Sequence, residues 1–590
     1  MQPDSSAISE IPAGGRLAAA GVLALAALLF FARLGSRSLW HSEFLWAEIA
    51  REMQLTHDYF SPAIVGCVYY DKPPVSYWLI LAAAWVTGML NEAACRIPSA
   101  LAGLMAVGLL MLLVHRLYDW STAALSGFIL ATSFSFVFFS RTASADVETI
   151  AGELGALLLF MRHEERQDGW WTVGLWLIMA AASLTKGLLG FVLPIMIIGL
   201  FCVLAEGWRE LGERLLHGSA GGRIRWVIAR NHWLFNRKSL VAIPIGLAFY
   251  CWPFVVSRAL SGSNQGFYMA WRENVVRFFR PFDHRNPVYL YCCAIFALMA
   301  PWSILLPAAL VQAHRDRRCG LEPRRSDRFI LIFFWATLAF FTVSGSRRGY
   351  YLLPILPAAA VLVARLLLRR EQLFSAAKRL LNFGFWTIAA AALGAVVFLI
   401  QPHVPLPPPW DVYLSMSERA VLALFLAGMI AVLAYAWTSF GRERIVTALC
   451  VIAYLSMFFI HVFLIPTTNA YHDEQPFARR VMARLPTNSH LGLFQPFGVL
   501  GPLFYMAPLR PLPAFYQAAQ LGAAVAEGRI RWVIVRQKDI SGMGIGGIIV
   551  DAQQSFPFED PQQRRHKVVL MRVDRPPPGA PGPLRLDSAR

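Results

Sequence analysis

The chain has 590 residues, of which 57% are hydrophobic and only 15% are charged, and its mean hydropathy is +0.49. Soluble domains are nearer half apolar and a quarter charged, so this composition excludes an ordinary soluble protein. The formal net charge of +18 does not indicate nucleic-acid binding, because the basic residues lie in loops between apolar runs and form no basic stripe with interleaved aromatic residues. The eight cysteines are scattered, which is not typical of a disulfide framework.

Apolar runs close to the ~20 residues that cross a bilayer recur from residue 17 to about residue 466. We expect the first run, 17–33, to be a retained span and not a signal peptide, because no clear cleavage site follows it. The loops 207–239 and 314–328 are rich in Lys and Arg, and the positive-inside rule places both in the cytoplasm. With a cytoplasmic N-terminus, this holds only if the short run 75–90 lies in the membrane interface and does not cross.

The prediction is therefore a mainly α polytopic membrane protein with about thirteen transmembrane helices and an outer C-terminus. After the first span, the expected spans are 96–114, 121–140, 147–162, 170–185, 188–206, 240–258, 288–312, 329–345, 351–368, 382–401, 419–438 and 446–465. A long outer loop, 35–95, follows the first span.

Two interfacial helices are predicted in this outer loop. The sequence SEFLWAEIAREM, 42–53, alternates as an amphipathic helix that can lie in the interface. Its apolar side chains, among them Phe44 and Ile49, can face the membrane. Its charged side chains Glu43, Glu48 and Arg51 are expected to face water or a site.

The second interfacial helix follows the stretch YYDKPPVSYW, 69–78. Asp71 can cap the helix N-terminus, and prolines suit the first turn of a helix because their missing N–H costs nothing there. Lys72 adds a full positive charge to the partial charge of that N-terminus. The stretch therefore predicts a binding site for an anion, and a lipid phosphate is the anion found at this depth. For Asp71, a cap and a site carboxylate both remain open.

Other charged residues at the predicted outer face are few, and ionisable groups at membrane depth are usually functional or paired. Asp146 opens a span and is either a helix cap or a site carboxylate. Lys186 lies at a turn between two spans, where it either serves the site or reaches to the interface. Arg347 and Arg348 share a short outer turn, where their guanidinium groups suit phosphate oxygens of a substrate or of lipid headgroups. Further candidates are Arg277, His284 and Tyr350.

The tail differs from the rest of the chain. HLGLF, RWVIV and KVVLMRV are typical of short strands, and AAQLGAAVAEG is typical of a helix between two of them. We predict a transmembrane domain over 1–466, a periplasmic α/β domain over 467–575 and a disordered Pro/Gly-rich end over 576–590.

Taken together, the outer motifs resemble a known family. WHSEFLWAEIAREM…FSPAIVGCVYYDKPPVSYWL resembles the first outer loop of the ArnT-like and protein O-mannosyltransferase-like membrane glycosyltransferases of the GT-C fold. The segments SRTASAD, LTKGLLGFVLP, ENVVRFF, PWSILLP and SRRGYYLLPILP match in order, over about residues 35 to 370. The set is specific, although no single motif is. The family's Asp-Glu doublet is replaced here by Ser42-Glu43, and the Arg two residues after it is Leu45.

The resemblance implies a sugar donor on a polyprenyl phosphate and an acceptor on the periplasmic face of the bacterial inner membrane, which is a lipid A-like lipid, a glycan or a protein. It implies inverting displacement at the anomeric carbon, with Glu43 or Asp146 as the base, unless the acceptor needs none. Lys72, Arg347 and Arg348 would hold the lipid phosphate. The other expected substrate-binding residues are Asp71, Lys186, Arg277, His284 and Tyr350.

Two questions follow from the resemblance. ArnT-like members can carry a metal near the acid of the acid-Lys-Pro-Pro motif, and Asp71 and His284 are the ligands that this chain could offer to a divalent cation; no other cofactor is expected. The rival interpretation is a transporter or flippase for a lipid-linked anion. It would explain the basic outer residues, but it predicts broken helices in symmetry-related halves, which the sequence does not indicate. A non-enzymatic envelope assembly protein is a third class, supported only by the tail.

Overall fold

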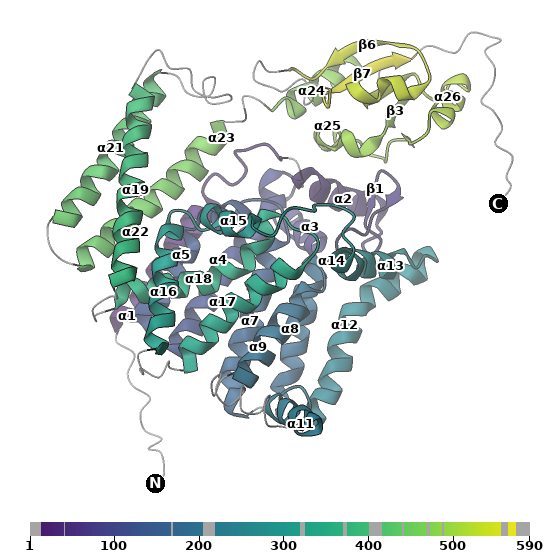
Figure 1. Cartoon of the computed structure of the whole chain (residues 1–590). Coiled ribbons are helices and arrows are strands. Elements are labelled where there is room, and N and C mark those ends of the chain that lie inside the picture. Colours follow the sequence, from purple (N-terminus) through teal and green to yellow (C-terminus); the bar gives the residue numbers. More distant parts are fainter. Residues whose placement is uncertain are drawn as a thin grey trace.

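The computed structural model describes residues 13–40, 42–166, 169–204, 219–318, 325–369, 375–400, 416–438, 442–467, 469, 472–485, 489–555 and 565–573. These residues form a body of packed helices with a small α/β unit above one end of it (Figure 1). The mainly helical fold class is confirmed. The predicted end segment 576–590 lies outside the described residues.

The helices of the first half are α1 (Ala13–Phe31), α2 (Glu43–Thr56), α3 (Val75–Thr87), α4 (Glu92–Leu117), α5 (Trp120–Ala131), α6 (Phe134–Ser140), α7 (Asp146–His163), α8 (Trp171–Lys186), α9 (Leu189–Leu204), α11 (Ala220–Arg230), α12 (Arg237–Ser261), α13 (Gln265–Trp271) and α14 (Arg277–Phe279). Those that follow in the body are α15 (Leu290–Leu298), α16 (Leu306–Arg318), α17 (Arg325–Val343), α18 (Leu356–Leu368), α19 (Ser375–Ile400), α21 (Met416–Thr438), α22 (Arg442–Phe458) and α23 (Ile465–Thr467). Two π-helical segments, η2 (Arg272–Val276) and η5 (Phe459–Leu464), and the 3-10 segments η3 (Trp302–Leu305) and η4 (Gly349–Ile355) interrupt them.

Side-chain caps and small residues explain why the body packs as it does. The Asn91 side chain accepts a hydrogen bond from the Ala94 backbone N–H (2.9 Å) and begins α4, as expected of an N-cap. Asp119 begins α5 in the same way. Helix α7 lies in the centre of the body, against α4 and α8. Gly152 lets α7 approach α8 closely, because a Cβ there would meet Ala182.

Among the described residues, five helices are long and apolar enough to cross a membrane, or six if the bent pair α5–α6 counts as one span. They include α4, α12 and α17. The chain is therefore a multi-pass membrane protein, whereas the count of about thirteen spans stays a prediction. Helix α3 has 13 residues and is about 20 Å long, which is shorter than the ~30 Å hydrocarbon core. This length agrees with an interfacial position for 75–90, and the orientation of the chain stays a prediction.

Two predicted spans are not continuous helices. The span predicted at 121–140 is bent by 70° between α5 and α6, and the one predicted at 288–312 is broken between α15 and α16. The two breaks contact each other: the Phe134 N–H donates to the Ala300 carbonyl (2.9 Å), and Trp302 Nε1 donates to Thr132 Oγ1 (2.9 Å). Pro301, which has no N–H, explains the second break. The bend between α5 and α6 depends on the contact with Ala300, which is distant in the sequence and could not be predicted from it.

The C-terminal unit has a five-stranded sheet in the order β4-β3-β5-β7-β6. Its strands are β3 (Leu491–Phe494), β4 (Ala514–Phe515), β5 (Trp532–Arg536), β6 (Gly547–Ala552) and β7 (Val568–Val573), and its helices are α24 (Glu474–Arg484), α25 (Leu500–Met506) and α26 (Ala518–Ala526). The three predicted strands and the predicted helix are confirmed, and β4 and β6 were not predicted. β3 is parallel to β4 and β5, whereas β7 is antiparallel to β5 and β6.

The two faces of this sheet pack differently. Alternate residues of a strand point to opposite faces, so Val533 and Val535 pack with Leu521 of α26 on one side. Ile534 and Leu570 join a core on the other side that also contains residues of α25 and of α2. The unit therefore packs on the segment 35–95, for which an outer position is predicted.

This contact changes the expectation for α2. The amphipathic helix predicted at 42–53 exists, but Glu43 and Glu48 are 0% exposed and Arg51 is 8% exposed. They do not face water: Glu43 is enclosed by Arg96 and Arg37, and the Glu48–Arg51 pair lies against the C-terminal unit. Arg51 pairs with Glu48 and donates to the Pro508 carbonyl (2.8 Å).

Candidate active site

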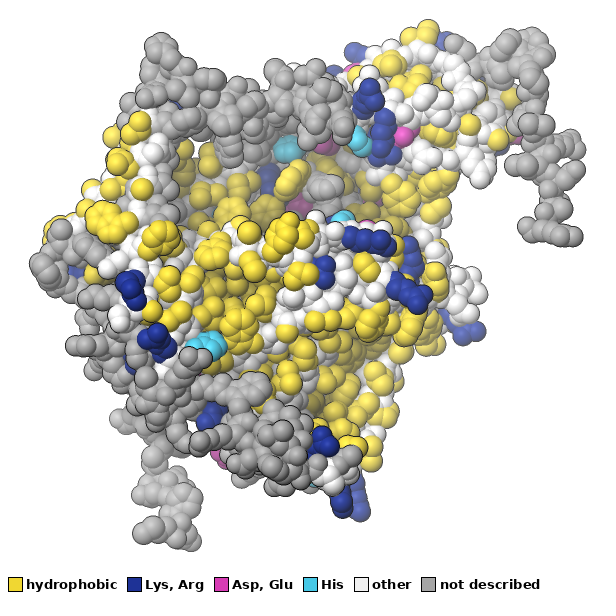
Figure 2. Space-filling view, viewed as in Figure 1, with side chains coloured by type: hydrophobic (Ala, Val, Ile, Leu, Met, Phe, Trp, Pro, Cys, Tyr) yellow, Lys and Arg dark blue, Asp and Glu magenta, His cyan; other side chains and the backbone are white. Residues whose placement is uncertain are grey.

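The site is a chain of contacting polar side chains, which we call the polar cluster. It consists of Asp71, Lys72, Asp146, Lys186, Glu273, Arg277, Asp283, His284, Arg348 and Tyr350. These residues come from the segment before α3, the start of α7, the end of α8, the segment η2–α14, the loop after it and the residues around the start of η4. Figure 2 shows basic, acidic and histidine side chains between the helical body and the C-terminal unit, above a hydrophobic flank.

Asp146 and Lys186 form the first pair of the cluster. Asp146 is the first residue of α7, whose N-cap is Ala145 and has no side-chain cap, so the cap interpretation of Asp146 is wrong. Its carboxylate pairs with Lys186 Nζ, and the two side chains are 10% and 19% exposed. Lys186 is the last residue of α8, which ends because Gly187 adopts φ +128°. The predicted approach of these two residues to one site is thereby supported by geometry.

Lys186 also contacts the aromatic residues that follow Arg348. Its Nζ lies 5.6 Å from the ring centroid of Tyr350 and 5.7 Å from that of Tyr351. A cation over an aromatic face at this distance is attracted to it. Lys186 therefore contacts Asp146 of α7 and also the aromatic rings of η4.

Asp71 and Lys72 form the second pair. Helix α3 begins only at Val75, and its N-cap, Pro74, has no side-chain cap, so Asp71 does not cap the helix. A residue that precedes proline is disfavoured in helical conformation, and this keeps Lys72 outside α3. Lys72 Nζ lies 3.1 Å from Asp71 Oδ2 and donates to the Asp71 carbonyl (3.0 Å).

Glu273, from a distant segment of the chain, lies next to Asp71 of this pair. Burial would raise the pKa of Asp71, but Lys72 beside it, together with Arg277 and a hydrogen bond from Glu273, leaves that pKa below its ordinary value. Burial, followed by the charge of Asp71, raises the pKa of Glu273. Arg277 Nη1 lies 2.8 Å from Glu273, and Arg277 Nε donates to Asp283 (3.0 Å). Arg277 therefore joins Glu273, which is the partner of Asp71, to the loop that follows α14.

Arg348, which directly precedes η4, contacts this loop at His284. Its Nη1 donates to the Tyr350 hydroxyl (2.6 Å), and its Nη2 contacts His284 Nε2. His284 Nε2 is also 3.1 Å from Asp283 Oδ2. Burial, and then the charge of Arg348, lowers the pKa of His284. His284 has φ +51°, a conformation that is uncommon for a residue with a side chain and that concentrates at functional sites.

Arg347 plays a different part from its neighbour. Its Nη1 donates to the Asn286 carbonyl (3.0 Å) and its Nη2 to the Thr342 carbonyl (3.0 Å). Its backbone N–H donates to the His284 carbonyl (2.8 Å). These contacts direct the guanidinium of Arg347 to the backbone, so we regard it as a residue that positions the loop and not as a phosphate ligand.

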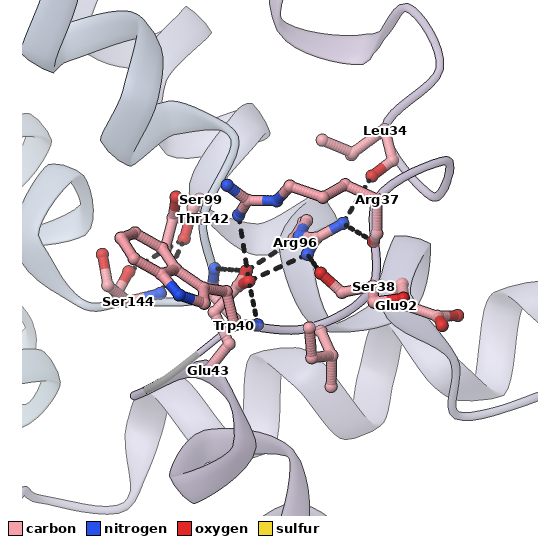
Figure 3. Close-up of polar contacts among 12 residues, drawn as sticks. Leu34, Arg37, Ser38, Trp40, Glu43, Glu92, Arg96, Ser99, Thr142 and Ser144 are labelled. Atoms are coloured by element: carbon pink, nitrogen blue, oxygen red, sulfur yellow. Dashed lines mark hydrogen bonds and ion pairs between the residues drawn. The ribbon is translucent and has the colours of Figure 1, made fainter. Parts of the chain in front are cut away.

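Glu43 lies apart from the cluster, in a buried network (Figure 3). Arg96 binds both of its carboxylate oxygens (2.7 and 2.8 Å), and Arg37 binds Oε2 (3.0 Å). The backbone N–H groups of Trp40 and Ala143 also donate to it (2.9 Å each). Burial would raise the pKa of Glu43, but the charges of Arg96 and Arg37 outweigh it and lower that pKa. A carboxylate this enclosed cannot reach a substrate, so Glu43 is not suited to be the base.

The metal interpretation finds little support in these contacts. Asp71 pairs with Lys72, and His284 contacts Arg348, so each candidate ligand already faces a cation. Within the described ranges, no group of three or more His, Cys, Asp or Glu side chains is placed to hold a metal ion. The residues therefore do not fit a resident metal, and we derive no step through one.

Comparison with known proteins identifies the family. Residues 71–234 match the family described as dolichyl-phosphate-mannose-protein mannosyltransferase. An undecaprenyl phosphate-alpha-4-amino-4-deoxy-L-arabinose arabinosyl transferase of Pseudomonas aeruginosa strain LESB58 is 30% identical over 402 residues, which are 66% of this chain and 67% of that protein. The chain belongs to the ArnT-like family of membrane glycosyltransferases.

Further relatives agree with this ArnT-like assignment. Transferase 1 of Pseudomonas fluorescens strain Pf-5, which has the same description, is 28% identical over 409 residues, covering 68% of this chain and 67% of that protein. The crystal structure of ArnT from Cupriavidus metallidurans bound to undecaprenyl phosphate has the same fold. Its TM-score is 0.69 at 19% identity, over 95% of this chain and 98% of that chain.

The family decides between the rival classes. This ArnT-like chain is an enzyme, a glycosyltransferase that uses a lipid-linked sugar donor, in a multi-pass protein of the bacterial inner membrane. The transporter interpretation is set aside on this ground and not on helix continuity, since two predicted spans are in fact broken. Sequence reasoning omitted Glu273 and Asp283 from the site. Their signals were present, because Glu273 opens the ENVVRFF segment and Asp283 precedes His284.

Proposed function

We propose that this chain transfers a sugar from a polyprenyl phosphate to an acceptor on the periplasmic face of the inner membrane, and that the acceptor is a lipid A-like lipid, a glycan or a protein. The polar cluster carries the proposal. It combines cations suited to a lipid phosphate with partly exposed carboxylates, among them Asp146. The named relatives support an undecaprenyl-phosphate-linked aminoarabinose as the first donor to test.

The donor phosphate would lie between Lys72 and Arg348. The Lys72 side chain is 20% exposed, and the Arg348 guanidinium presents a planar fork beside the Tyr350 hydroxyl. Charge-assisted hydrogen bonds from such groups are stronger than neutral ones. They would also stabilise the charge that builds on the leaving phosphate oxygen in the transition state. Arg277 holds the loop from which Asp283 and His284 approach this position.

The reaction is a single displacement. An acceptor hydroxyl oxygen attacks the anomeric carbon and forms the new glycosidic bond, while the bond from that carbon to the phosphate oxygen breaks on the opposite side. The polyprenyl phosphate leaves with the electron pair. The hydroxyl proton passes to the carboxylate of Asp146, which acts as general base. Lys186, whose Nζ also lies over the ring of Tyr350, holds Asp146 in position.

The substitution Ser42→Asp tests whether Asp146 is the base, because the resembling family has Asp at this position. Ser42 is exposed and precedes α2 without a side-chain cap hydrogen bond, so Ser42→Asp should fold normally. If Asp146 is the base, Ser42→Asp changes turnover by no more than a few-fold. An increase of about 10²-fold or more, the scale of a general base, would show that position 42 supplies the missing base.

The decisive assay of the function uses the purified full-length protein, undecaprenyl phosphate carrying a radiolabelled aminopentose, and separate acceptor fractions of lipid A-type lipid, oligosaccharide and protein. We expect label to appear in one fraction, with one free polyprenyl phosphate formed for each sugar transferred. Label that crosses a vesicle membrane while the donor stays intact would refute the proposal.

A further inference from the structure

A second basic site lies outside the polar cluster. The end of α1, the end of α6 and the segment η5–α23 surround a cavity that encloses about 290 Å³ of empty space, with its open mouth included. Four arginines and one histidine line it, and we call it the arginine cavity: Arg33, Arg37, Arg96, Arg141 and His461. Figure 3 shows two of its residues, Arg37 and Arg96, above the Glu43 carboxylate.

The positive charge of this cavity is not balanced. Among the described residues, Glu43 is the one carboxylate that pairs with any of the four arginines, and it binds Arg37 and Arg96 together. Arg141 is 8% exposed and donates to backbone carbonyls at the end of α1. Arg33 donates one long hydrogen bond, to the Val462 carbonyl (3.4 Å), and its guanidinium lies 5.8 Å from the ring centroid of Phe463. Arg33 and Arg141 have no carboxylate partner among the described residues, and buried charges such as that of Arg141 are normally paired.

His461 adds an independent sign of a missing partner. It is 3% exposed, and within the described ranges its Nε2 has no hydrogen-bond partner. Unsatisfied buried polar atoms are rare and call for an explanation. His461 lies in the π-helical segment η5, and π-helical turns occur frequently at functional sites. An anion in the cavity would balance the arginines and would accept a hydrogen bond from Nε2 of the protonated His461 ring.

We propose that the arginine cavity is a second anion site, which binds a terminal phosphate group at the outer side of the membrane protein. Guanidinium groups favour phosphate because their fork matches two oxygens at once. The cavity is joined to the polar cluster by the short segment 141–146, with Arg141 at one end and Asp146 at the other. Where the proposed function holds, a lipid bound here by its phosphate would lie beside the base and not at the donor position.

The test is a binding measurement that needs no sugar transfer. Purified protein is first saturated with polyprenyl phosphate, and native mass spectrometry then counts added phosphatidic acid, a lipid with a terminal phosphate. We expect one further phosphatidic acid, with binding at least about tenfold weaker in the double variant Arg33→Gln/His461→Gln, the scale of lost charge-assisted contacts. Arg258→Gln, which removes an exposed arginine at the end of α12, is the matched control and should bind normally.

Two arms separate the possible sources of phosphate. If millimolar inorganic phosphate displaces the lipid, free phosphate is itself a ligand; if it does not, the lipid chains contribute and the site takes lipid phosphate. Equal binding of phosphatidylcholine, or unchanged binding in the variants, would overturn the proposal. Should the double variant not fold, Arg33→Gln alone serves, because that side chain is exposed. If the protein binds phosphatidic acid in the arginine cavity but transfers no sugar, only the proposed function is refuted.

Discussion

Lys72→Ala is the perturbation for which the structure gives the clearest contrast between stability and binding. The ion pair that it removes is partly exposed, since the two side chains are 20% and 24% exposed, and such pairs contribute at most about 1 kcal/mol. Helix α3 begins three residues later and takes no cap from this pair. The thermal stability of the protein should therefore change little. Donor binding should lose a charge-assisted contact of about 1.5–3 kcal/mol, which is roughly a tenfold to hundredfold weakening.

The assay measures both quantities on the same preparation. Calorimetric titration with polyprenyl phosphate gives donor affinity, and the melting curve gives stability. Lys72→Arg should recover only part of the affinity, because a planar fork does not replace a point charge. Arg285→Ala, which removes an exposed arginine whose Nε binds the Pro281 carbonyl, should bind donor normally. Normal donor affinity in Lys72→Ala would refute the assignment of the stretch 69–78 to the donor phosphate.

Three further expectations follow from the geometry. Asp146→Asn should lower turnover by about 10²–10⁴-fold with donor affinity little changed; a near-normal rate would remove Asp146 as the base. Arg96→Met leaves the buried Glu43 with fewer partners and should destabilise the protein by about 3–5 kcal/mol, measured by thermal melting; an unchanged melting temperature would contradict the structural role of this pair. Because the pKa of His284 is lowered in the folded protein, folding favours its neutral form, so this contribution to stability is present above the ordinary value of 6.5 and is lost as the pH falls through the lowered pKa. His284→Gln should flatten that part of the stability profile, and a profile that keeps its shape would show that the contact with Arg348 does not titrate.

The members of the polar cluster could be predicted from sequence because charged residues are rare near the outer ends of apolar runs. Asp146 and Lys186 were found in this way, and the structure brings them together across α7 and α8. Local pattern was insufficient where a distant segment decides the outcome. Glu43 has the pattern of an exposed helical residue, yet Arg96 and Arg37 enclose it.

The start of α3 shows a limit of a different kind. Residues that suit an N-cap and a first turn are all present in the stretch 69–78. Lys72, however, is a closer partner for Asp71 than the helix N–H groups are. The bend between α5 and α6 was equally hidden, because its partner, Ala300, is far away in sequence. Such outcomes depend on three-dimensional packing that one sequence does not display.

The most direct test of the account is a structure of the full-length protein with bound polyprenyl phosphate. The account predicts phosphate density within hydrogen-bond distance of Lys72 Nζ and of the Arg348 guanidinium, with Asp146 facing the side from which an acceptor would approach. Phosphate density in the arginine cavity alone, with the polar cluster unoccupied at saturating ligand, would contradict the assignment of the donor site.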